Sequence, residues 1–204
     1  MAQHSEINTQ HIGTFWMLKL DRPLPAGLEP RIPTNFMRIG PEIAQELAQA
    51  MELDGPTVIL QRFAAGRHCY AARVAGQLVT YGWVTFDEED IGELGLSIRL
   101  KAGEAYIWDC ATLPAYRGLR LYPALLTHML HALHAQGIQR VWIGTDTDNL
   151  ASQIGIVAAG FQPVADFLTI NTPSMRTVRL RGFSGVSTQD LEDVHHALFG
   201  NRDH

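Results

Sequence analysis

The sequence is poor in cysteine. It contains only Cys69 and Cys110, and their spacing fits neither a zinc-binding pattern nor a disulfide framework. Both lie in apolar stretches with the pattern of β-strands, so we expect them to be small buried core residues. We therefore expect no bound metal, and a reducing, cytoplasmic environment for the protein.

The sequence also lacks an excess of positive charge and any long apolar run. Lys and Arg number 16 against 21 Asp and Glu, which gives a net charge of -5. A nucleic-acid-binding protein would normally show a basic face, so this class is disfavoured. No apolar run approaches the ~20 residues that cross a bilayer, and the polar first ten residues do not have the pattern of a signal peptide. We expect neither nucleic acid nor a membrane as a partner.

The chain of 204 residues, 46% of them hydrophobic, is long enough for a single domain with a substantial core. Residues 1–13 are expected as a loose polar lead-in and residues 185–204 as a small C-terminal extension that contains a helix. Four prolines between positions 23 and 33 predict an irregular surface segment.

The hydrophobic pattern predicts a mixture of strands and helices. Strands are expected at 15–20, 69–76, 77–86, 93–100, 105–112, 140–145, 161–170 and 176–181, and helices at 41–51, 119–136 and 149–159. Two hairpins are expected, one closing at Gly76-Gln77 and one joining 93–100 to 105–112, with a solvated acidic loop at 87–90 between them. Hairpins and the absence of a GxGxxG motif argue against a Rossmann-type nucleotide binder.

The helix predicted at 119–136 has two distinct faces. Its apolar face comprises Leu125, Leu126, Met129, Leu130 and Leu133. The opposite face carries His128, His131 and His134, which we interpret as a solvated stripe rather than as metal ligands.

The stretch from Tyr106 to Gln136 organises the chain, because it reads as a buried strand, a glycine-containing turn and a long helix. The first turn of a helix has unpartnered N–H groups and a partial positive charge, which favour an anion. Two guanidiniums in the turn, Arg117 and Arg120, suit phosphate groups. The turn is therefore predicted to hold the pyrophosphate of a nucleotide-like cofactor.

These residues resemble the signature of the GNAT superfamily, the acetyl-CoA-dependent N-acetyltransferases, in which a strand leads into Tyr-Arg-Gly-x-Gly-x-Gly/Ala at a helix start. Pro114, Tyr116, Arg117 and Gly118 match it. A second motif of the family, Asn-x-x-Ala-x-x-x-Tyr-x-x-x-Gly-Phe, is matched at Asn149 and at Gly160-Phe161. The resemblance covers residues 68–170 and implies an α/β (α+β) fold, a mixed and mostly antiparallel twisted sheet flanked by helices.

Besides the mild changes at Thr112 and Ser152, three positions depart from the two motifs. Arg120 stands where the family usually has a second glycine, and Tyr122 where it has Gly or Ala. Ile156 stands where many members have the tyrosine that protonates the departing thiolate. Tyr122, Ser152 and Tyr116 are possible substitutes, and a thiol pKa near ~8.5 also allows the thiolate to leave unprotonated.

The resemblance implies acetyl-CoA as the cofactor. The residues expected to bind it are Cys110, Ala111, Thr112, Arg117, Gly118, Leu119, Arg120, Leu121, Tyr122, Asn149 and Ser152. The backbone from Cys110 to Thr112 is expected to pair with the pantetheine arm and to stabilise the developing oxyanion.

The implied chemistry is direct attack of an amine on the acetyl thioester in a ternary complex. The catalytic residues expected are Asp109 and Tyr122. A charged residue inside a strand is costly unless it has a partner or faces a cleft, so Asp109 either contacts the substrate amine as general base or anchors a neighbouring arginine. Glu104 is the second choice for the base. Three aromatic residues either line the acceptor pocket or belong to the core: Trp83, Trp108 and Tyr81.

The sequence thus predicts an N-acetyltransferase that acts on a small-molecule amine such as an amino sugar or amino acid, as a monomer or homodimer. One alternative is a non-catalytic acyl-CoA-binding or regulatory domain, motivated by Ile156 and the missing glycines. Another is a relative that transfers aminoacyl or longer acyl groups.

Overall fold

The computed structural model describes residues 8–200 except for 22, 25, 27, 93, 173 and 174. Eight strands form one sheet in the order β10-β9-β1-β8-β7-β4-β3-β2, and β5 and β6 form a separate small sheet. All neighbouring strands pair antiparallel except β7 and β8, which are parallel. The predicted fold class, a mixed and mostly antiparallel sheet flanked by helices, is confirmed.

The bounds of the elements are as follows. The strands are β1 Asn8–Lys19, β2 Asn35–Ile39, β3 His68–Val74, β4 Gln77–Thr85, β5 Glu88–Ile91, β6 Leu96–Arg99, β7 Glu104–Thr112, β8 Arg140–Asp146, β9 Gln162–Thr172 and β10 Met175–Gly182. The α-helices are α1 Ala44–Ala50, α2 Thr57–Ala64, α3 Leu121–Ala135, α4 Leu150–Ala158 and α5 Thr188–Phe199, with short 3-10 helices at Pro41–Ile43 and Pro114–Tyr116.

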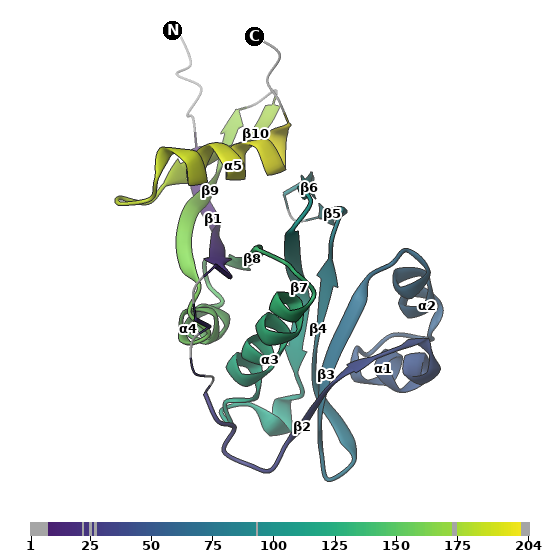
Figure 1. The fold of residues 1–204 in the computed structure, drawn as a ribbon. Helices are drawn as coiled ribbons and strands as arrows, with labels where there is room; N and C mark the ends of the chain where they lie inside the picture. The colour runs from purple at the N-terminus through teal and green to yellow at the C-terminus, as the bar shows by residue number, and fades with distance from the viewer. Residues whose placement is uncertain are drawn as a thin grey trace, which may run out of the picture.

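Helices cover both faces of the large sheet. The predicted apolar face of α3 packs on the central strands, where Leu126 and Met129 share a core with Val84 and Ile107. On the opposite face, α1 and α2 pack against β3 and β4, and α5 packs against β1, β8 and β9. Figure 1 shows α3 in front of β7 and β4, with α1 and α2 together beside β3. The sheet centre is thus buried on both sides.

Three expectations about the strands are corrected. The first strand begins at Asn8, so residues 8–13 belong to β1 and are not a loose lead-in, while residues 1–7 lie outside the described part. The acidic run is not a solvated loop, because Glu88 to Ile91 forms β5 and Glu89 pairs with Arg67 at 2.9 Å. Strand β6 pairs with β5 and not with β7, so the predicted 93–112 hairpin is wrong; Glu93 itself lies outside the described residues.

The reason for the wrong hairpin is the position of β7. This strand lies between β4 and β8 in the large sheet, and it is buried along its first half. A strand with neighbours on both edges has no edge left for β6. The hydrophobic pattern alone showed that two strands follow each other but not which strands they pair with.

The helices largely follow the predicted ranges, but α2 and the edge strand β2 were not predicted. The predicted histidine stripe is only partly solvated. His128 is half-buried, its ring stacked on Phe36 with centroids 5.6 Å apart, and burial lowers its pKa. No described helix is both long and apolar enough to span a membrane.

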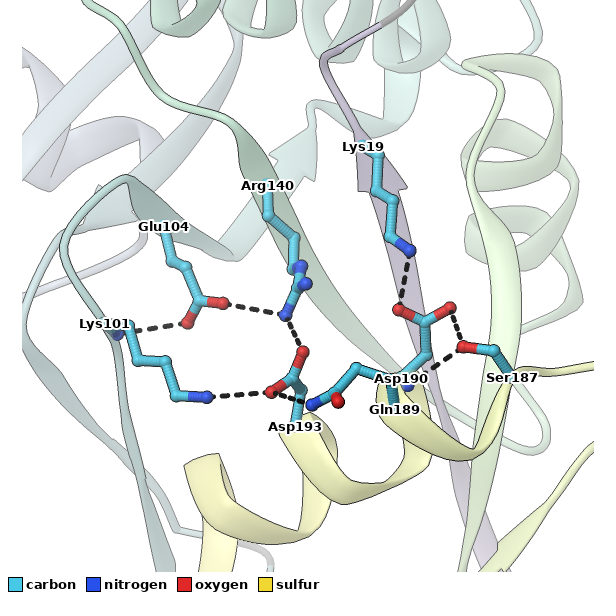
Figure 2. A network of polar contacts seen from close by, with 8 residues as sticks. All are labelled: Lys19, Lys101, Glu104, Arg140, Ser187, Gln189, Asp190 and Asp193. Atoms are coloured by element: carbon cyan, nitrogen blue, oxygen red, sulfur yellow. Dashed lines mark hydrogen bonds and ion pairs between the residues drawn. The ribbon is translucent and has the colours of Figure 1, made fainter.

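The C-terminal helix α5 is attached to the sheet by ion pairs as well as by apolar contacts. Asp193 accepts hydrogen bonds from Lys101 at 2.8 Å and from Arg140 at 2.6 Å, and Arg140 also contacts Glu104 at 3.0 Å. Asp190 pairs with Lys19 of β1 at 2.8 Å. Figure 2 shows that these partners come from β1, β8 and the start of β7, so the described part of the C-terminal extension is docked on the sheet.

Candidate functional site

The site lies where β7 and β8 separate. The two strands are parallel partners from Glu104 to Ile107 on β7 and from Arg140 to Ile143 on β8. Beyond these residues each strand stays with its other neighbour, β7 with β4 as far as Thr112 and β8 with β1 as far as Asp146. A pocket of about 500 Å³ lies at this divergence. A gap in the middle of a sheet exposes strand backbone that a ligand can pair with.

A β-bulge in β7 shapes the pocket. Tyr81 of β4 pairs with Ala111, but Trp83 pairs with Trp108, so β7 contains one extra residue here. Asp109 takes up the bulge with a φ of 44°, in the left-handed region. A bulge disrupts the ladder locally and re-aims a side chain, as bulges beside active sites do.

Gly82 faces this bulge from β4. A Cβ at Gly82 would lie 2.7 Å from Sγ of Cys110, closer than side-chain atoms approach each other. The glycine therefore makes room for the bulged strand. Burial raises the pKa of the Cys110 thiol, with the Asp109 charge adding to the effect, so the thiol remains protonated at neutral pH.

Asp109 forms an ion pair with Arg62 of α2, with Nη1 and Oδ2 2.5 Å apart. The Arg62 guanidinium also lies 4.5 Å from the ring centroid of Trp108 and 5.1 Å from that of Trp83. Cation–π contacts of this kind hold a guanidinium in place. Both members of the pair line the pocket. Thus Asp109 faces the cleft and anchors an arginine at the same time.

Tyr122 and Ser152 meet on the helical side of the pocket, with their hydroxyl oxygens 3.1 Å apart. The Tyr122 ring lies against Gly155 of α4, where an added Cβ would come within 2.5 Å of the ring. Burial raises the pKa of Tyr122 well above its usual value, so its phenol is protonated at neutral pH. Ile156, the next residue of α4, is fully buried in the core under α3.

The turn before α3 has the conformation that the missing glycine would suit. Gly118 has a φ of 77° and Arg120 a φ of 61°, and α3 begins at Leu121. A non-glycine residue in the left-handed region costs about 1–2 kcal/mol. The side chains of Arg117 and Arg120 are exposed. A hydrogen bond from the backbone N–H of Arg31 to the carbonyl oxygen of Leu119, 3.0 Å long, stabilises the turn.

Of the predicted site residues, five line the pocket together: Asp109, Cys110, Tyr122, Asn149 and Ser152. Asn149 also caps α4, because its Oδ1 accepts from the backbone N–H of Ser152 at 3.1 Å. The remaining residues continue from the pocket along β7 and the turn without lining it: Ala111, Thr112, Arg117, Gly118, Leu119, Arg120 and Leu121. The Thr112 side chain is hydrogen-bonded to β4, with its Oγ1 2.9 Å from Oγ1 of Thr80.

The second choice for the base is wrong. Glu104 is buried, bound to Arg140 and to the backbone N–H of Lys101 at 3.1 Å, and does not line the pocket. Of the three candidate aromatic residues, Trp108 lines the pocket, while Trp83 and Tyr81 belong to the core between the sheet and α1–α2. Tyr116 is also outside the lining, and its hydroxyl donates to Gln77 at 2.9 Å.

Sequence reasoning missed one wall of the pocket. Arg62 comes from an unpredicted helix, and another part of the wall is formed by Asp90, Ile91, Gly92 and Leu94. Ile12 and Gly13 of β1 and Phe167 of β9 complete it. These segments are far apart in the chain, and no local pattern connects them. In the described part of the chain, no cluster of three or more His, Cys, Asp or Glu has the geometry to hold a metal ion.

Comparison with known proteins gives consistent similarities of fold. An acetyltransferase of the GNAT family from Colwellia psychrerythraea is 15% identical with a TM-score of 0.60, and the match covers 82% of this chain and 58% of that one. A tandem GNAT protein of the clavulanic acid biosynthesis pathway is 20% identical with a TM-score of 0.55, covering 88% and 56% of the two chains. A GCN5-related N-acetyltransferase from Sphaerobacter thermophilus is 14% identical with a TM-score of 0.57, covering 86% and 55%.

The chain therefore spans less than three fifths of the length of these three solved structures. None of the curated protein sequences matches it. The sequence model of the Acetyltransferase (GNAT) family matches residues 40–154, which is more than half of the chain and includes the bulge, the arginine-containing turn and the start of α4. This chain belongs to the GNAT acetyltransferase family.

Proposed function

We propose that this chain is an N-acetyltransferase that moves an acetyl group from acetyl-CoA to the amine of a small molecule by direct attack in a ternary complex. The observation that carries the proposal is the pocket at the divergence of β7 and β8, with a bulge beside it and a helix N-terminus at its far end. In this arrangement the strand backbone could donate hydrogen bonds to a thioester, and the positively charged turn could bind phosphates. The pocket could hold the acceptor.

Acetyl-CoA fits the site in two parts. The turn that carries Arg117 and Arg120 would hold the pyrophosphate, because both side chains are exposed next to the N-terminus of α3. The pantetheine arm would then lie along β7 at Cys110 to Thr112, on the edge that has separated from β8. The thioester would reach the bulge, where the disrupted ladder leaves a backbone N–H for the oxyanion.

The reaction forms a C–N bond and breaks a C–S bond. The neutral amine attacks the carbonyl carbon of the thioester, and the tetrahedral intermediate collapses to an amide and the CoA thiolate. An acceptor that enters as an ammonium loses one proton before the attack and another afterwards. One of these protons goes to the sulfur, so the net products are the N-acetyl amide, CoA thiol and one proton.

Tyr122 is the proposed donor of the proton to sulfur. Its phenol is protonated, lies in the pocket and is positioned by Ser152 and by the space above Gly155. The phenol would replace the family tyrosine that is absent at Ile156. General acid catalysis of this kind is typically worth a factor of about 10²–10⁴.

Asp109 is the proposed acceptor of the amine proton, directly or through a water molecule. It faces the pocket from the bulge, and Arg62 holds its carboxylate in position. Asp109→Asn should lower kcat and leave the dissociation constant of acetyl-CoA unchanged. Full turnover by this variant would remove Asp109 from the mechanism.

Calorimetric titration with acetyl-CoA, CoA and ATP, followed by measurement of thiol release with a panel of amines, tests the proposed function. We expect binding of acetyl-CoA and CoA but not of ATP, and thiol release that depends on an amine. Binding without thiol release for any amine would instead favour the non-catalytic acyl-CoA-binding domain. A panel of longer acyl-CoA donors separates acetyl transfer from transfer of other acyl groups.

The two free cysteines, Cys69 and Cys110, support a reducing, cytoplasmic location as part of this proposal.

A further inference from the structure

We propose that the acceptor is an α-amino acid with an apolar side chain, an inference that rests on the acetyl-transfer function proposed above. Three features of the pocket carry it: the Arg62–Asp109 ion pair, the scarcity of other positive charge among the described lining residues, and an apolar part of the wall that includes Trp108.

The Arg62–Asp109 pair is complementary in charge to the carboxylate and ammonium groups of an amino-acid zwitterion. A guanidinium has five N–H donors, and Asp109 is the only hydrogen-bond acceptor that Arg62 has among the described residues. The rings of Trp83 and Trp108 lie 5.1 and 4.5 Å from the guanidinium carbon, and they hold this cation while its remaining N–H groups stay available. Those donors are suited to the two oxygens of a carboxylate.

Asp109 presents the opposite charge a few ångströms away. Only its Oδ2 has a hydrogen-bond partner within the described part of the chain, which leaves Oδ1 for an ammonium group. An acceptor whose amine and carboxylate are separated by one carbon atom can therefore place the amine at Asp109 and the carboxylate at Arg62. The amine would then lie beside the bulge, where the thioester is expected.

Arg62 is also the only cation among the described residues that line the pocket, whereas Asp90 and Asp146 add negative charge. Asp90 is engaged by the hydroxyl of Ser97 at 2.7 Å. A carboxylate on the acceptor consequently has one cationic partner among the described lining residues, Arg62. This makes Arg62 the residue that would decide between an amino acid and an amine without a carboxylate.

One part of the pocket wall is apolar, and Trp108 of this part lies against the Arg62 guanidinium. The side chains of this part are Ile12, Ile91, Leu94, Trp108 and Phe167. An amino sugar would bring several hydroxyl groups against these side chains, and buried hydroxyl groups without partners are costly. An aromatic or aliphatic amino acid would instead bury its side chain there. The rest of the lining is polar, so between the two acceptor classes expected from the sequence the choice of the amino acid depends on the Arg62–Asp109 pair.

The test compares substrates that differ in one group. L-phenylalanine, 2-phenylethylamine and glucosamine are offered to the wild-type protein with saturating acetyl-CoA, and kcat/KM is measured from thiol release. We expect L-phenylalanine to exceed 2-phenylethylamine, which has the same ring but no carboxylate, by about 10- to 100-fold, the range for a charge-assisted contact. Glucosamine should be the poorest of the three.

Substitution of Arg62 tests the assignment of the carboxylate contact. Arg62→Met should bring the ratio of the first two substrates close to one, and Arg62→Lys should leave an intermediate ratio, because it keeps the charge but loses the planar fork. The ratio within one variant cancels any general loss of activity. Arg99→Gln is the control, because Arg99 is exposed on β6 and does not line the pocket. Its ratio should equal that of the wild type.

The possible failures are distinguishable. A ratio near one in the wild-type protein, or a preference for glucosamine, would overturn the amino-acid inference and leave acetyl transfer standing. A wild-type ratio that persists in Arg62→Met would overturn the role of Arg62. If acetyl-CoA binds but no amine releases thiol, the proposed function itself fails, and the inference fails with it.

Discussion

At the scale of single residues, Ser152, Gly155 and Ile156 of α4 determine the surroundings of Tyr122, the proposed proton donor. The donor expected at Ile156 is absent, and the isoleucine fills the core instead. Gly155 leaves the space that the Tyr122 ring occupies, and Ser152 contacts the Tyr122 hydroxyl. The two departures from the family pattern thus lie close together, because the Tyr122 ring packs on Gly155, the residue next to Ile156, and both side chains belong to the same apolar cluster.

Tyr122→Phe tests this link. The variant keeps the ring against Gly155 and removes only the hydroxyl, so we expect kcat to fall by about 10²-fold or more. The dissociation constant of acetyl-CoA should stay within a factor of about two, because the packing is retained. Tyr116→Phe is the matched control and should be fully active, since Tyr116 bonds to Gln77 outside the pocket. Unchanged kcat in Tyr122→Phe would exclude the phenol as the acid.

Arg120 gives a second prediction, in which stability and binding change in opposite directions. Arg120→Gly removes the strain of a φ of 61° and should stabilise the fold by about 1 kcal/mol, while it removes a phosphate contact and weakens acetyl-CoA binding. Denaturant unfolding and calorimetry measure the two effects. Arg120→Ala is the control, because it loses the charge but keeps the strain. If both variants are equally stable, the left-handed conformation is not strained.

At the scale of secondary structure, α5 is the element most dependent on charge. Asp190 and Asp193 lie on this helix, and both are mostly buried. Burial alone would raise their pKa values, but the hydrogen bonds and charges of Lys19 for Asp190, and of Lys101 and Arg140 for Asp193, outweigh it. Both pKa values are therefore lowered on folding (Figure 2).

A lowered pKa stabilises the folded state above the pKa of the unfolded chain, near ~3.9, and this stabilisation is lost as pH falls through the folded pKa. We expect the melting temperature to decrease when the pH is lowered below about 4, because the carboxylates of Asp190 and Asp193 become protonated and lose their ion pairs. Asp193→Asn should lower the free energy of unfolding at pH 7 by about 1–3 kcal/mol and weaken this acid dependence. Thermal unfolding between pH 3 and 7 measures both.

Glu192→Gln is the matched control for α5, because Glu192 is exposed on the same helix. It should change neither the stability at neutral pH nor its decrease in acid. An acid dependence that is the same in Asp193→Asn as in the wild type would show that other carboxylates control acid unfolding.

At the scale of the whole molecule, acetyl-CoA would bridge the two parts of a divided sheet. One part contains β10, β9, β1 and β8 and the other contains β7, β4, β3 and β2. Among the described residues, the strand pairing between the two parts is the short parallel pairing of β7 with β8. A ligand in the gap would contact both parts. Its binding should therefore stabilise the folded chain as a whole.

We expect acetyl-CoA at about 100 times its dissociation constant to add about 2.7 kcal/mol, which raises the melting temperature by about 5–10 °C for a chain of this size. A thermal shift assay measures this increase. At the same acetyl-CoA concentration, Arg117→Ala should show a smaller increase, because it loses about 1–3 kcal/mol of binding through the phosphate contact. An equal increase in this variant would contradict the placement of the pyrophosphate.

The class of fold and the Tyr106–Gln136 unit were predictable from the sequence alone, as were five residues that line one pocket, Asp109, Cys110, Tyr122, Asn149 and Ser152. These follow from local patterns, because strand alternation, helix periodicity and glycine-containing turns are written in consecutive residues. The two family motifs lie within such segments and were recognisable for the same reason.

The order of the strands, the place where the sheet opens and the residues of the pocket wall became known only from the folded chain. Strand β6 pairs with β5, and Arg62 meets Asp109 across 47 positions of the chain. Such contacts depend on packing between distant segments, for which a single sequence carries no periodic signal. The bulge at Asp109 likewise needs Gly82 on the facing strand, so its effect on the pocket emerges only when the two strands pair.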